Sequence, residues 1–218
     1  MGDPIETLTW GSGRLSLHAE EQFLDGVAWC ERFFMGEAEV HKALFKLVGI
    51  LDAEQIPHAV IGALALNEYG HRRATVDVDL ILRDDDLQRF KRKYLGQGYA
   101  ERVPGTGKLI DTEYNVKIDV LSTGRFPGDG QPKPIAFPDP ATTALRGGKF
   151  ALLPLPQFIE LKLASGMTAP HRLHDLADVL NLIRSTGLPA SFVEKLDPYV
   201  RPKFDELWQA AQTRDPYE

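Results

Sequence analysis

Residues 62–82 read GALALNEYGHRRATVDVDLIL, and the second half of this stretch has the composition of a buried β-strand interrupted by two carboxylates. Asp77 and Asp79 lie two residues apart, so on a strand both side chains point to the same face. Val78 and Leu80 point to the opposite face. Two adjacent anions repel each other and are costly to desolvate unless a cation lies between them. The pattern is therefore typical either of a site for a hard divalent metal such as Mg²⁺ or of a surface strand whose carboxylates face water.

The residues before this strand favour the first interpretation. A short apolar run, residues 58–61, leads directly into Gly62-Ala63, and the helical segment 64–69 is followed by Gly70, where a helix is expected to stop. A strand, a turn of small residues and a helix start together present several backbone N–H groups, and phosphate binds readily to such a nest. The same glycine is also explained by an ordinary tight turn. Combined with the Asp pair, the stretch predicts a phosphate-binding turn beside a metal site.

In this combination of a Gly-plus-small-residue turn, a helix and Asp-x-Asp on the next strand, the chain resembles the nucleotidyltransferase superfamily of the DNA polymerase β type. The resemblance implies an α/β (α+β) fold, in which helices flank a mixed β-sheet and a helical part follows at the C-terminal end. It also implies a third carboxylate on a later strand.

A predicted β-hairpin supplies that third carboxylate. Its segments, 109–111 and 116–121, flank a turn at 112–115. Asp119 lies in the place that the family pattern expects. Asp111 competes for the same role, but the residues around it alternate less regularly between apolar and polar. We therefore expect Asp119 to be the functional carboxylate.

Within the superfamily, the chain looks most like the AbiEii/AbiGii toxin-type nucleotidyltransferases, and the resemblance covers about residues 57–186. These proteins carry a Lys in one helix followed by an Asp in the next, and Lys162 and Asp175 match that motif. Lys162 alone is better explained as a residue on an amphipathic helix whose charged end reaches the solvent, and only the match to the motif favours a functional role. His174 and Asp178 stand close to Asp175 and are alternative partners for the lysine.

The resemblance implies a set of site residues. Three are expected to hold Mg²⁺ or Mn²⁺: Asp77, Asp79 and Asp119. The same three, with Lys162 and Asp175, are the expected catalytic residues. Residues expected to bind the NTP are Gly62, Ala63, Arg73, Thr75 and Lys162. One position departs from the family, because Ala63 stands where a second Gly or a Ser is usual and so offers no hydroxyl to the triphosphate.

The first functional hypothesis is therefore a metal-dependent enzyme that moves a nucleoside monophosphate from an NTP to an acceptor hydroxyl. The acceptor could be RNA, such as a tRNA end, a protein side chain, or a small molecule such as an aminoglycoside. A resemblance to the toxins also implies a possible antitoxin protein as partner. The alternative is a catalytically silent nucleotide-binding or regulatory module, which Ala63 favours slightly. A metal-dependent phosphohydrolase is disfavoured because the His-Asp metal pair of many such enzymes is missing.

The composition of the chain argues against several other classes of protein. The net charge of −6 argues against nucleic-acid binding by charge over the whole surface. Cys30 is the single cysteine, so neither a disulfide framework nor a Cys-based zinc site is possible within one chain. No run has the length of a membrane span, and the N-terminus lacks a signal pattern. These features predict a cytoplasmic protein without membrane contact.

Three parts are predicted along the chain: an N-terminal extension (1–35), the nucleotidyltransferase core (36–153) and a helical C-terminal subdomain (154–218). Residues 1–17 are expected to be extended or poorly ordered, and the Gly/Pro-rich stretch 123–140 to be a loop that acts as a lid or partner contact. Helices are expected at 18–36, 37–55, 84–95, 155–166 and 173–184, with one or two after Pro189. The acidic triplet 84–86 is read as a helix start. Short edge strands are expected at 135–137 and 150–153.

Overall fold

The computed structural model describes residues 17–146 and 148–213, with side chains from residue 24 onward, and the chain divides into two compact units, Met1–Ala38 and Glu39–Glu218. In the first unit, α1 (Leu17–Phe34) confirms the helix predicted at 18–36. The segment expected to be extended, 1–17, lies outside the described residues apart from its last position. No helix in the described part of the chain is long and apolar enough to cross a membrane.

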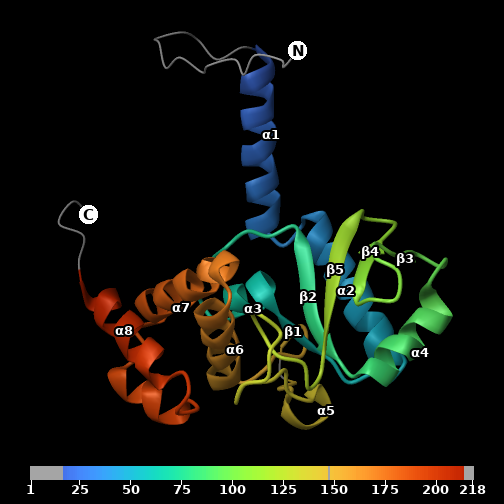
Figure 1. Cartoon of the computed structure of the whole chain (residues 1–218). Coiled ribbons are helices and arrows are strands. Elements are labelled where there is room, and N and C mark those ends of the chain that lie inside the picture. The colour runs from blue at the N-terminus through green and yellow to red at the C-terminus, as the bar shows by residue number, and fades with distance from the viewer. Residues whose placement is uncertain (1–16, 147, 214–218) are drawn as a thin grey trace, which may run out of the picture. The chain divides into compact units, whose positions relative to one another are not determined.

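The second unit is built on a mixed five-stranded sheet with the order β1-β2-β5-β4-β3 (Figure 1). The strands are β1 (Ala59–Ile61), β2 (Asp77–Leu82), β3 (Tyr99–Glu101), β4 (Lys108–Asp111) and β5 (Val116–Ser122). Only the central pair, β2 and β5, is parallel; the other neighbours are antiparallel. The predicted strand around the Asp pair and the predicted hairpin are confirmed as β2 and β4–β5.

Alternation along β2 and β5 gives the sheet two different faces. Val78 and Leu80 on β2, like Ile118 and Val120 on β5, are buried. Helix α2 (Glu39–Ala53) packs against these two strands and confirms the helix predicted at 37–55. Its predicted apolar face is buried: Val40, Leu44, Leu47, Val48 and Leu51.

Short helices connect and flank the sheet. Helix α3 (Gly62–Glu68) follows β1 without a linker, and α4 (Asp84–Tyr94) follows β2. The triplet 84–86 forms the first turn of α4, as predicted, because carboxylates are favourable at the N-terminal end of a helix.

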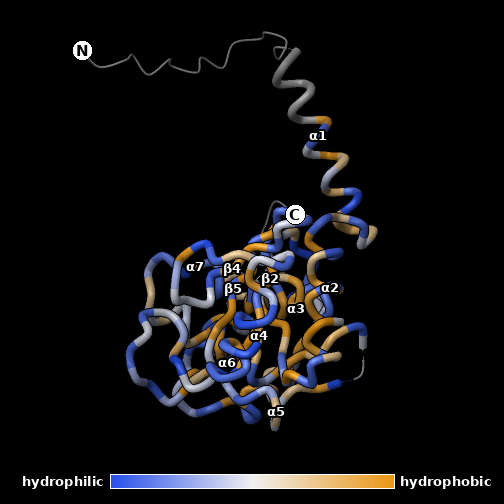
Figure 2. Tube along the Cα trace, turned by 90° about the vertical axis from the view of Figure 1, so that its right-hand side faces the viewer, coloured by the Kyte–Doolittle hydropathy of each residue, from blue (hydrophilic) through white to orange (hydrophobic). Residues whose placement is uncertain are grey.

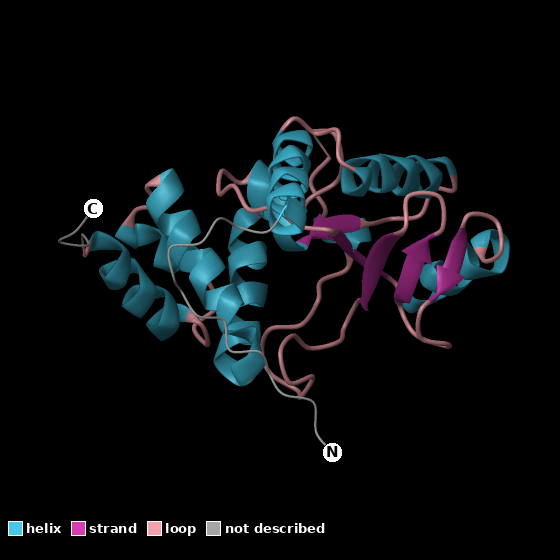
Figure 3. Cartoon of the chain, turned by 90° about the horizontal axis from the view of Figure 1, so that it is seen from above, coloured by secondary structure: helices cyan, strands magenta, loops and turns pink. Residues whose placement is uncertain are grey.

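The C-terminal helices form a group on the β1 side of the sheet (Figure 3). They are α6 (Leu155–Thr168), α7 (Leu173–Thr186) and α8 (Arg201–Gln212), with 3₁₀ turns at Pro170–Arg172 and Ala190–Lys195. The short helix α5 (Pro140–Thr143) precedes this group in the chain. The helices predicted at 155–166 and 173–184, and those after Pro189, are confirmed. Gly166 allows α6 and α7 to approach closely, because a Cβ there would lie 2.5 Å from Leu176.

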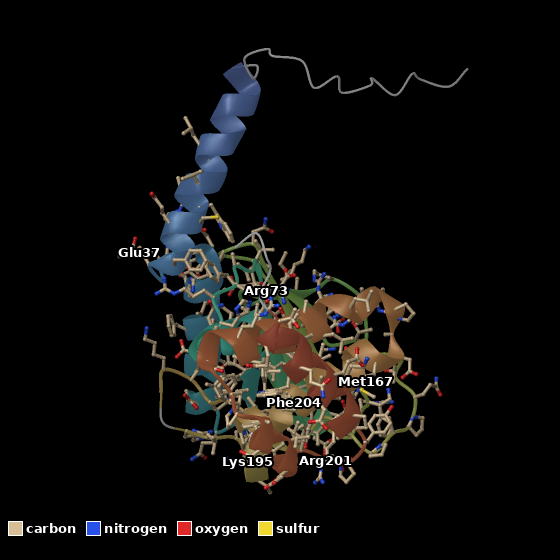
Figure 4. All side chains as sticks on the ribbon, turned by 90° about the vertical axis from the view of Figure 1, so that its left-hand side faces the viewer. Glu37, Arg73, Met167, Lys195, Arg201 and Phe204 are labelled. Atoms are coloured by element: carbon tan, nitrogen blue, oxygen red, sulfur yellow. The ribbon has the colours of Figure 1, made fainter. Side chains whose placement is uncertain are left out.

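One hydrophobic cluster joins the sheet to these helices. Ile81 on β2, Leu66 on α3 and Phe158 on α6 belong to it together with Phe204 on α8, which is fully buried (Figure 4). Figure 2 shows the corresponding hydrophobic segments running through the interior of this unit. The cluster holds α6 and α7 in place beside the sheet. The finer division predicted at residue 154 stays a prediction.

Two predicted edge strands are wrong. Residues 135–137 and 150–153 form no strand; Leu152 makes only isolated bridges, to Val60 and to Leu145. Their apolar side chains instead fill the core, since Ile135, Phe137 and Leu153 are buried there. Conversely, β3 was not predicted, because three residues are too few to show an alternating pattern.

Candidate active site

A cavity of about 440 Å³ opens beside the polar face of β2 and β5. One wall is this sheet face, and the opposite wall comes from α6 and α7. The turn at Gly62-Ala63 and the loop around Phe126 close two further sides. All nine residues predicted for the site line this cavity: Gly62, Ala63, Arg73, Thr75, Asp77, Asp79, Asp119, Lys162 and Asp175.

Three carboxylates lie on the sheet wall. Asp77 and Asp79 share one face of β2, and Asp119 is the partner of Asp79 in the parallel register of β5. Asp77 has a buried carboxylate oxygen, Oδ1, without a hydrogen-bond partner in the described part of the chain. Burial, reinforced by the charges of Asp119 and Asp77, raises the pKa of Asp79 to about 6, although Lys162 and Arg172 oppose the shift. This group of anions is therefore only partly neutralised by the protein.

Gly62 is required by the Asp79 carboxylate. Its φ angle is +68°, and a Cβ at this position would lie 2.1 Å from Asp79 Oδ2. Only glycine adopts this conformation readily and leaves room for the carboxylate. The first turn of α3 therefore lies against Asp79. The turn that was predicted to bind phosphate thus also positions Asp79, a candidate metal ligand.

Asp119 already has two cationic partners. Lys108 Nζ lies 2.5 Å from Asp119 Oδ2, and Arg102 donates through Nη2 to Asp119 Oδ1. Among the described residues, no three Asp, Glu, His or Cys side chains meet as a ready-made metal site. The donor set nevertheless suits a hard divalent cation, because it offers only carboxylate oxygens and includes the unpartnered oxygen of Asp77. Asp119 would join such a site if a cationic partner gave way to the metal.

Asp111, the competing carboxylate, has a structural role. Its side chain is fully buried, pairs with Lys46 at 2.9 Å and accepts hydrogen bonds from the backbone N–H groups of Glu113 and Tyr114. It therefore stabilises the turn between β4 and β5. Asp111 does not line the cavity, and neither do residues 84–86.

Lys162 lies on the opposite wall and is buried, not directed to solvent. Its Nζ lies 3.0 Å from Asp175 Oδ1 and 2.7 Å from Asp178 Oδ2, so both candidate partners on α7 contact it. His174 lies 3.6 Å from Asp175 and does not replace it. Burial alone would raise the pKa of Asp175, but Lys162, the Ser165 hydroxyl and Arg172 together hold it below its usual value.

Arg73 (Figure 4) connects the loop before β2 to this network. Its Nη1 lies 2.5 Å from Asp178 Oδ2. Asn67 on α3 holds the Arg73 backbone from both sides, since its amide donates to the Arg73 carbonyl at 2.7 Å and accepts from the Arg73 N–H at 3.1 Å. Thr75 accepts a hydrogen bond from the Asp77 N–H at 3.3 Å and so orders the start of β2.

Several lining residues were not predicted, among them Lys108, Ser165, Arg172 and Phe126. A signal for Lys108 existed, because the hairpin turn at 112–115 sets a register in which Lys108 is opposite Asp119. Arg172 and Ser165 show no comparable pattern in the sequence. Their position depends on how α6 and α7 pack.

The long Gly/Pro-rich loop lies against α6 and supplies Phe126 and Gly128 to the cavity wall. The Lys133 side chain is only 4% exposed and donates to the Pro127 carbonyl at 2.6 Å, while a Cβ on Gly128 would lie 2.2 Å from Thr168 Oγ1. The segment 123–139 contains no helix or strand, which confirms the loop predicted for most of 123–140 but not the edge strand expected at 135–137. A lid function for this loop stays a prediction.

The chain is similar to a known protein in structure but not in sequence. The chain matches no protein-family model, and no curated protein matches its sequence. Among solved structures, it is similar to the aminoglycoside nucleotidyltransferase ANT(2″)-Ia, crystallised in complex with adenylyl-2″-tobramycin. The two share 13% identity with a TM-score of 0.50, over 76% of this chain and 96% of the other. The likeness confirms the predicted fold class: the chain has a nucleotidyltransferase-like fold.

Proposed function

We propose that the protein is a nucleotidyltransferase that depends on Mg²⁺ or Mn²⁺ and moves a nucleoside monophosphate from an NTP to an acceptor hydroxyl. The observation that carries the proposal is the polar face of the sheet. There Asp77 and Asp79 lie on β2, with Asp119 beside Asp79 on the parallel neighbour β5. Folding alone does not require such a concentration of carboxylates, since it costs electrostatic energy. A cation-binding function explains it.

The metal would be held by Asp77, Asp79 and Asp119. When bound, it would neutralise the phosphate oxygens and stabilise the charge that develops during transfer. In the reaction, the acceptor oxygen forms a bond to the α-phosphorus, and the bond from that phosphorus to the bridging oxygen of the β-phosphate breaks. Pyrophosphate leaves with the electron pair. Asp119 would help to accept the proton of the acceptor hydroxyl.

The opposite wall would hold the triphosphate. An ammonium group has three N–H donors, and Lys162 uses two of them on Asp175 and Asp178. The third remains for a phosphate oxygen. Asp175 would therefore orient Lys162, while Arg73, Thr75 and the Gly62-Ala63 turn lie where they could contact the nucleotide.

We propose three classes of molecule that could supply the acceptor hydroxyl. ANT(2″)-Ia was crystallised with an adenylylated aminoglycoside, which makes an aminoglycoside one candidate for this chain. An RNA end, including that of tRNA, or a protein side chain are the others. A role as the toxin of a toxin–antitoxin pair, with a neutralising antitoxin protein, follows from the AbiEii/AbiGii resemblance and stays a prediction.

The test is transfer of label from the four NTPs, each labelled at the α-phosphate, in the presence of Mg²⁺ or Mn²⁺. Total RNA, tobramycin and the protein itself would be supplied as acceptors in separate reactions. We expect label in one acceptor class with stoichiometric release of pyrophosphate, and no label when a chelator is present. Release of free nucleoside monophosphate without any labelled acceptor would point to a phosphohydrolase and contradict the proposal.

A second candidate is a nucleotide-binding module without catalysis. It is favoured by the state of Asp119, both of whose oxygens have cationic partners, and by Ala63 in the phosphate-binding turn. NTP binding detected by calorimetry, without transfer to any acceptor in the same buffer, would support this candidate over the enzyme.

A further inference from the structure

Both cationic partners of Asp119 come from the β3–β4 hairpin. Arg102 directly follows β3, and Lys108 is the first residue of β4. We call these two residues the cation clamp. Each carboxylate oxygen of Asp119 has one partner, Arg102 at Oδ1 and Lys108 at Oδ2. The clamp is therefore directed at the carboxylate that the proposed metal site would need.

The backbone that carries the clamp is firmly held. The Gly107 carbonyl accepts a hydrogen bond from the Val120 N–H at 2.9 Å, and a Cβ on Gly107 would lie 2.2 Å from the Val120 carbonyl oxygen. Lys91, which is buried, contacts Glu101 at 2.6 Å and the carbonyl of Thr106. Because this loop is tied to both α4 and β5, any movement of the clamp must come from its side chains.

The two clamp residues differ in freedom. Arg102 also donates through Nε to the Leu109 carbonyl at 3.0 Å, so its guanidinium is fixed at two points. Lys108 makes no other side-chain hydrogen bond or ion pair among the described residues, its side chain is 45% exposed, and it lines the cavity, which Arg102 does not. A lysine also has a flexible stem and a compact charge. Lys108 is thus the member that can change partners.

We propose that Lys108 is a positioning residue that holds Asp119 in the substrate-free protein and moves to a phosphate oxygen when a metal–triphosphate enters. This inference rests on the proposed function. A divalent cation beside Asp119 is repelled by the Lys108 ammonium, whereas a triphosphate offers that ammonium a new anionic partner. The exchange couples the two ligands, so that the free protein binds the metal weakly and the metal–triphosphate well.

The test uses Mn²⁺ alone and preformed Mn²⁺–tripolyphosphate, a probe that carries no base. Both are titrated calorimetrically into the wild type and Lys108→Met. Removing the charge should tighten Mn²⁺ binding and weaken Mn²⁺–tripolyphosphate binding, each by about fivefold or more, as is typical of coupled sites. Lys108→Gln is a second variant, and the thermal unfolding of every protein is measured to confirm folding.

Two controls separate partner exchange from a general charge effect. Arg102→Met should also tighten Mn²⁺ binding but should not weaken Mn²⁺–tripolyphosphate binding, because Arg102 lies outside the cavity lining. Lys42→Met, which removes an exposed lysine on α2 that does not line the cavity, should change neither.

The outcomes distinguish this inference from the proposed function. If the wild type binds Mn²⁺ and Lys108→Met changes neither affinity, or weakens both, the partner exchange is wrong while the metal site stands. If neither the wild type nor any variant binds Mn²⁺ or the complex, both proposals are overturned. The exchange is supported if Mn²⁺ binding tightens and Mn²⁺–tripolyphosphate binding weakens in the Lys108 variants but not in the control variants.

Discussion

Two acidic pairs, one on β2 and one on α7, are in opposite electrostatic states on the two sides of the cavity, which all of them but Asp178 line. On β2, Asp77 has an unpartnered oxygen, and burial raises the pKa of Asp79 to about 6. On α7, Asp175 and Asp178 are buried but contact Lys162, and the pKa of Asp175 lies below its usual value. The carboxylates on α7 are paired with cations of the protein, whereas Asp77 Oδ1 has no hydrogen-bond partner among the described residues and Asp79 is only partly neutralised. Under the proposed function, a cation from outside would neutralise the carboxylates on β2.

The largest expected effect is on activity. Replacing Asp77 and Asp79 together by Asn should reduce nucleotidyl transfer by about 10³-fold or more, because the phosphoryl charge loses its metal-based stabilisation. The unfolding free energy of the metal-free protein should not fall, since the repulsion between two anions is removed. Transfer assays and urea unfolding of the same preparation provide the two measurements.

The matched control is Asp84→Asn with Asp86→Asn, which also removes two carboxylates two residues apart but lies in the first turn of α4. This control should retain transfer. A β2 double variant that transfers nucleotide at the wild-type rate would place the chemistry elsewhere, and one that unfolds well below the wild type would make these carboxylates structural.

On the α6–α7 side of the cavity, where Lys162 pairs with Asp175 and Asp178, Lys162→Ala should strongly destabilise the protein. A lysine reaching solvent from a helix surface would be removed at little loss of stability, but here the substitution leaves Asp175 and Asp178 buried without their shared cation. Breaking a buried ion pair in this way costs about 3–5 kcal/mol. We expect a value at the low end because Arg172 and Arg73 remain.

Denaturant unfolding measures this loss, and Lys162→Met with Asp178→Asn is the informative second variant. Because it removes one anion along with the cation, it should recover part of the lost stability. If Lys162→Ala unfolds like the wild type, the network on α7 contributes little and the comparison between the walls fails.

A smaller effect of opposite sign is expected for Asp79→Asn in the presence of a chelator. The raised pKa means that the folded protein retains a proton that the unfolded chain releases from about pH 4. Stability from this group is therefore fully present below about pH 4, falls between about pH 4 and pH 6, and is absent above. At 1.36 kcal/mol per pKa unit, the variant should gain up to about 3 kcal/mol at pH 7.

Urea unfolding at several pH values tests this, since the advantage of Asp79→Asn should shrink as the pH falls from 7 to 4. Asp175→Asn provides the contrast. The lowered pKa of Asp175 contributes stability above the usual aspartate pKa, and that stability is lost as the pH falls through the folded pKa. An Asp79→Asn variant with no gain at pH 7 would show that the β2 wall is neutralised in the free protein.

The smallest effect is expected at the turn. Gly62→Ala places a methyl group against the Asp79 carboxylate and a non-glycine residue at φ +68°, which should destabilise the protein by about 1–2 kcal/mol. Adding Asp79→Ala removes the clash but leaves the backbone strain, so the double variant should lose less than the sum of the two changes. Strictly additive losses would separate the turn from the carboxylate.

Much of the fold was predictable because it depends on local pattern. Alternation predicted β2 and the β4–β5 hairpin, and helical spacing predicted α2, α6 and α7. The failures have physical causes. Residues 135–137 and 150–153 are apolar and β-branched or aromatic enough for strands, but tertiary packing uses them to fill the core beside α6. Strand β3 exists because β4 provides a partner, which a three-residue pattern does not reveal.

By itself, the sequence determined which carboxylates share a strand face, because a period of two residues requires no tertiary information. It also put a glycine at position 62, and the position of the hairpin turn set the register in which Lys108 is opposite Asp119. Only the tertiary structure decided that Asp79 lies against Gly62, that Lys162 is buried between Asp175 and Asp178, and that Arg73 reaches Asp178 from 105 residues away. Those contacts depend on how α6 and α7 pack against the sheet, and such long-range packing sets the charge state of each wall.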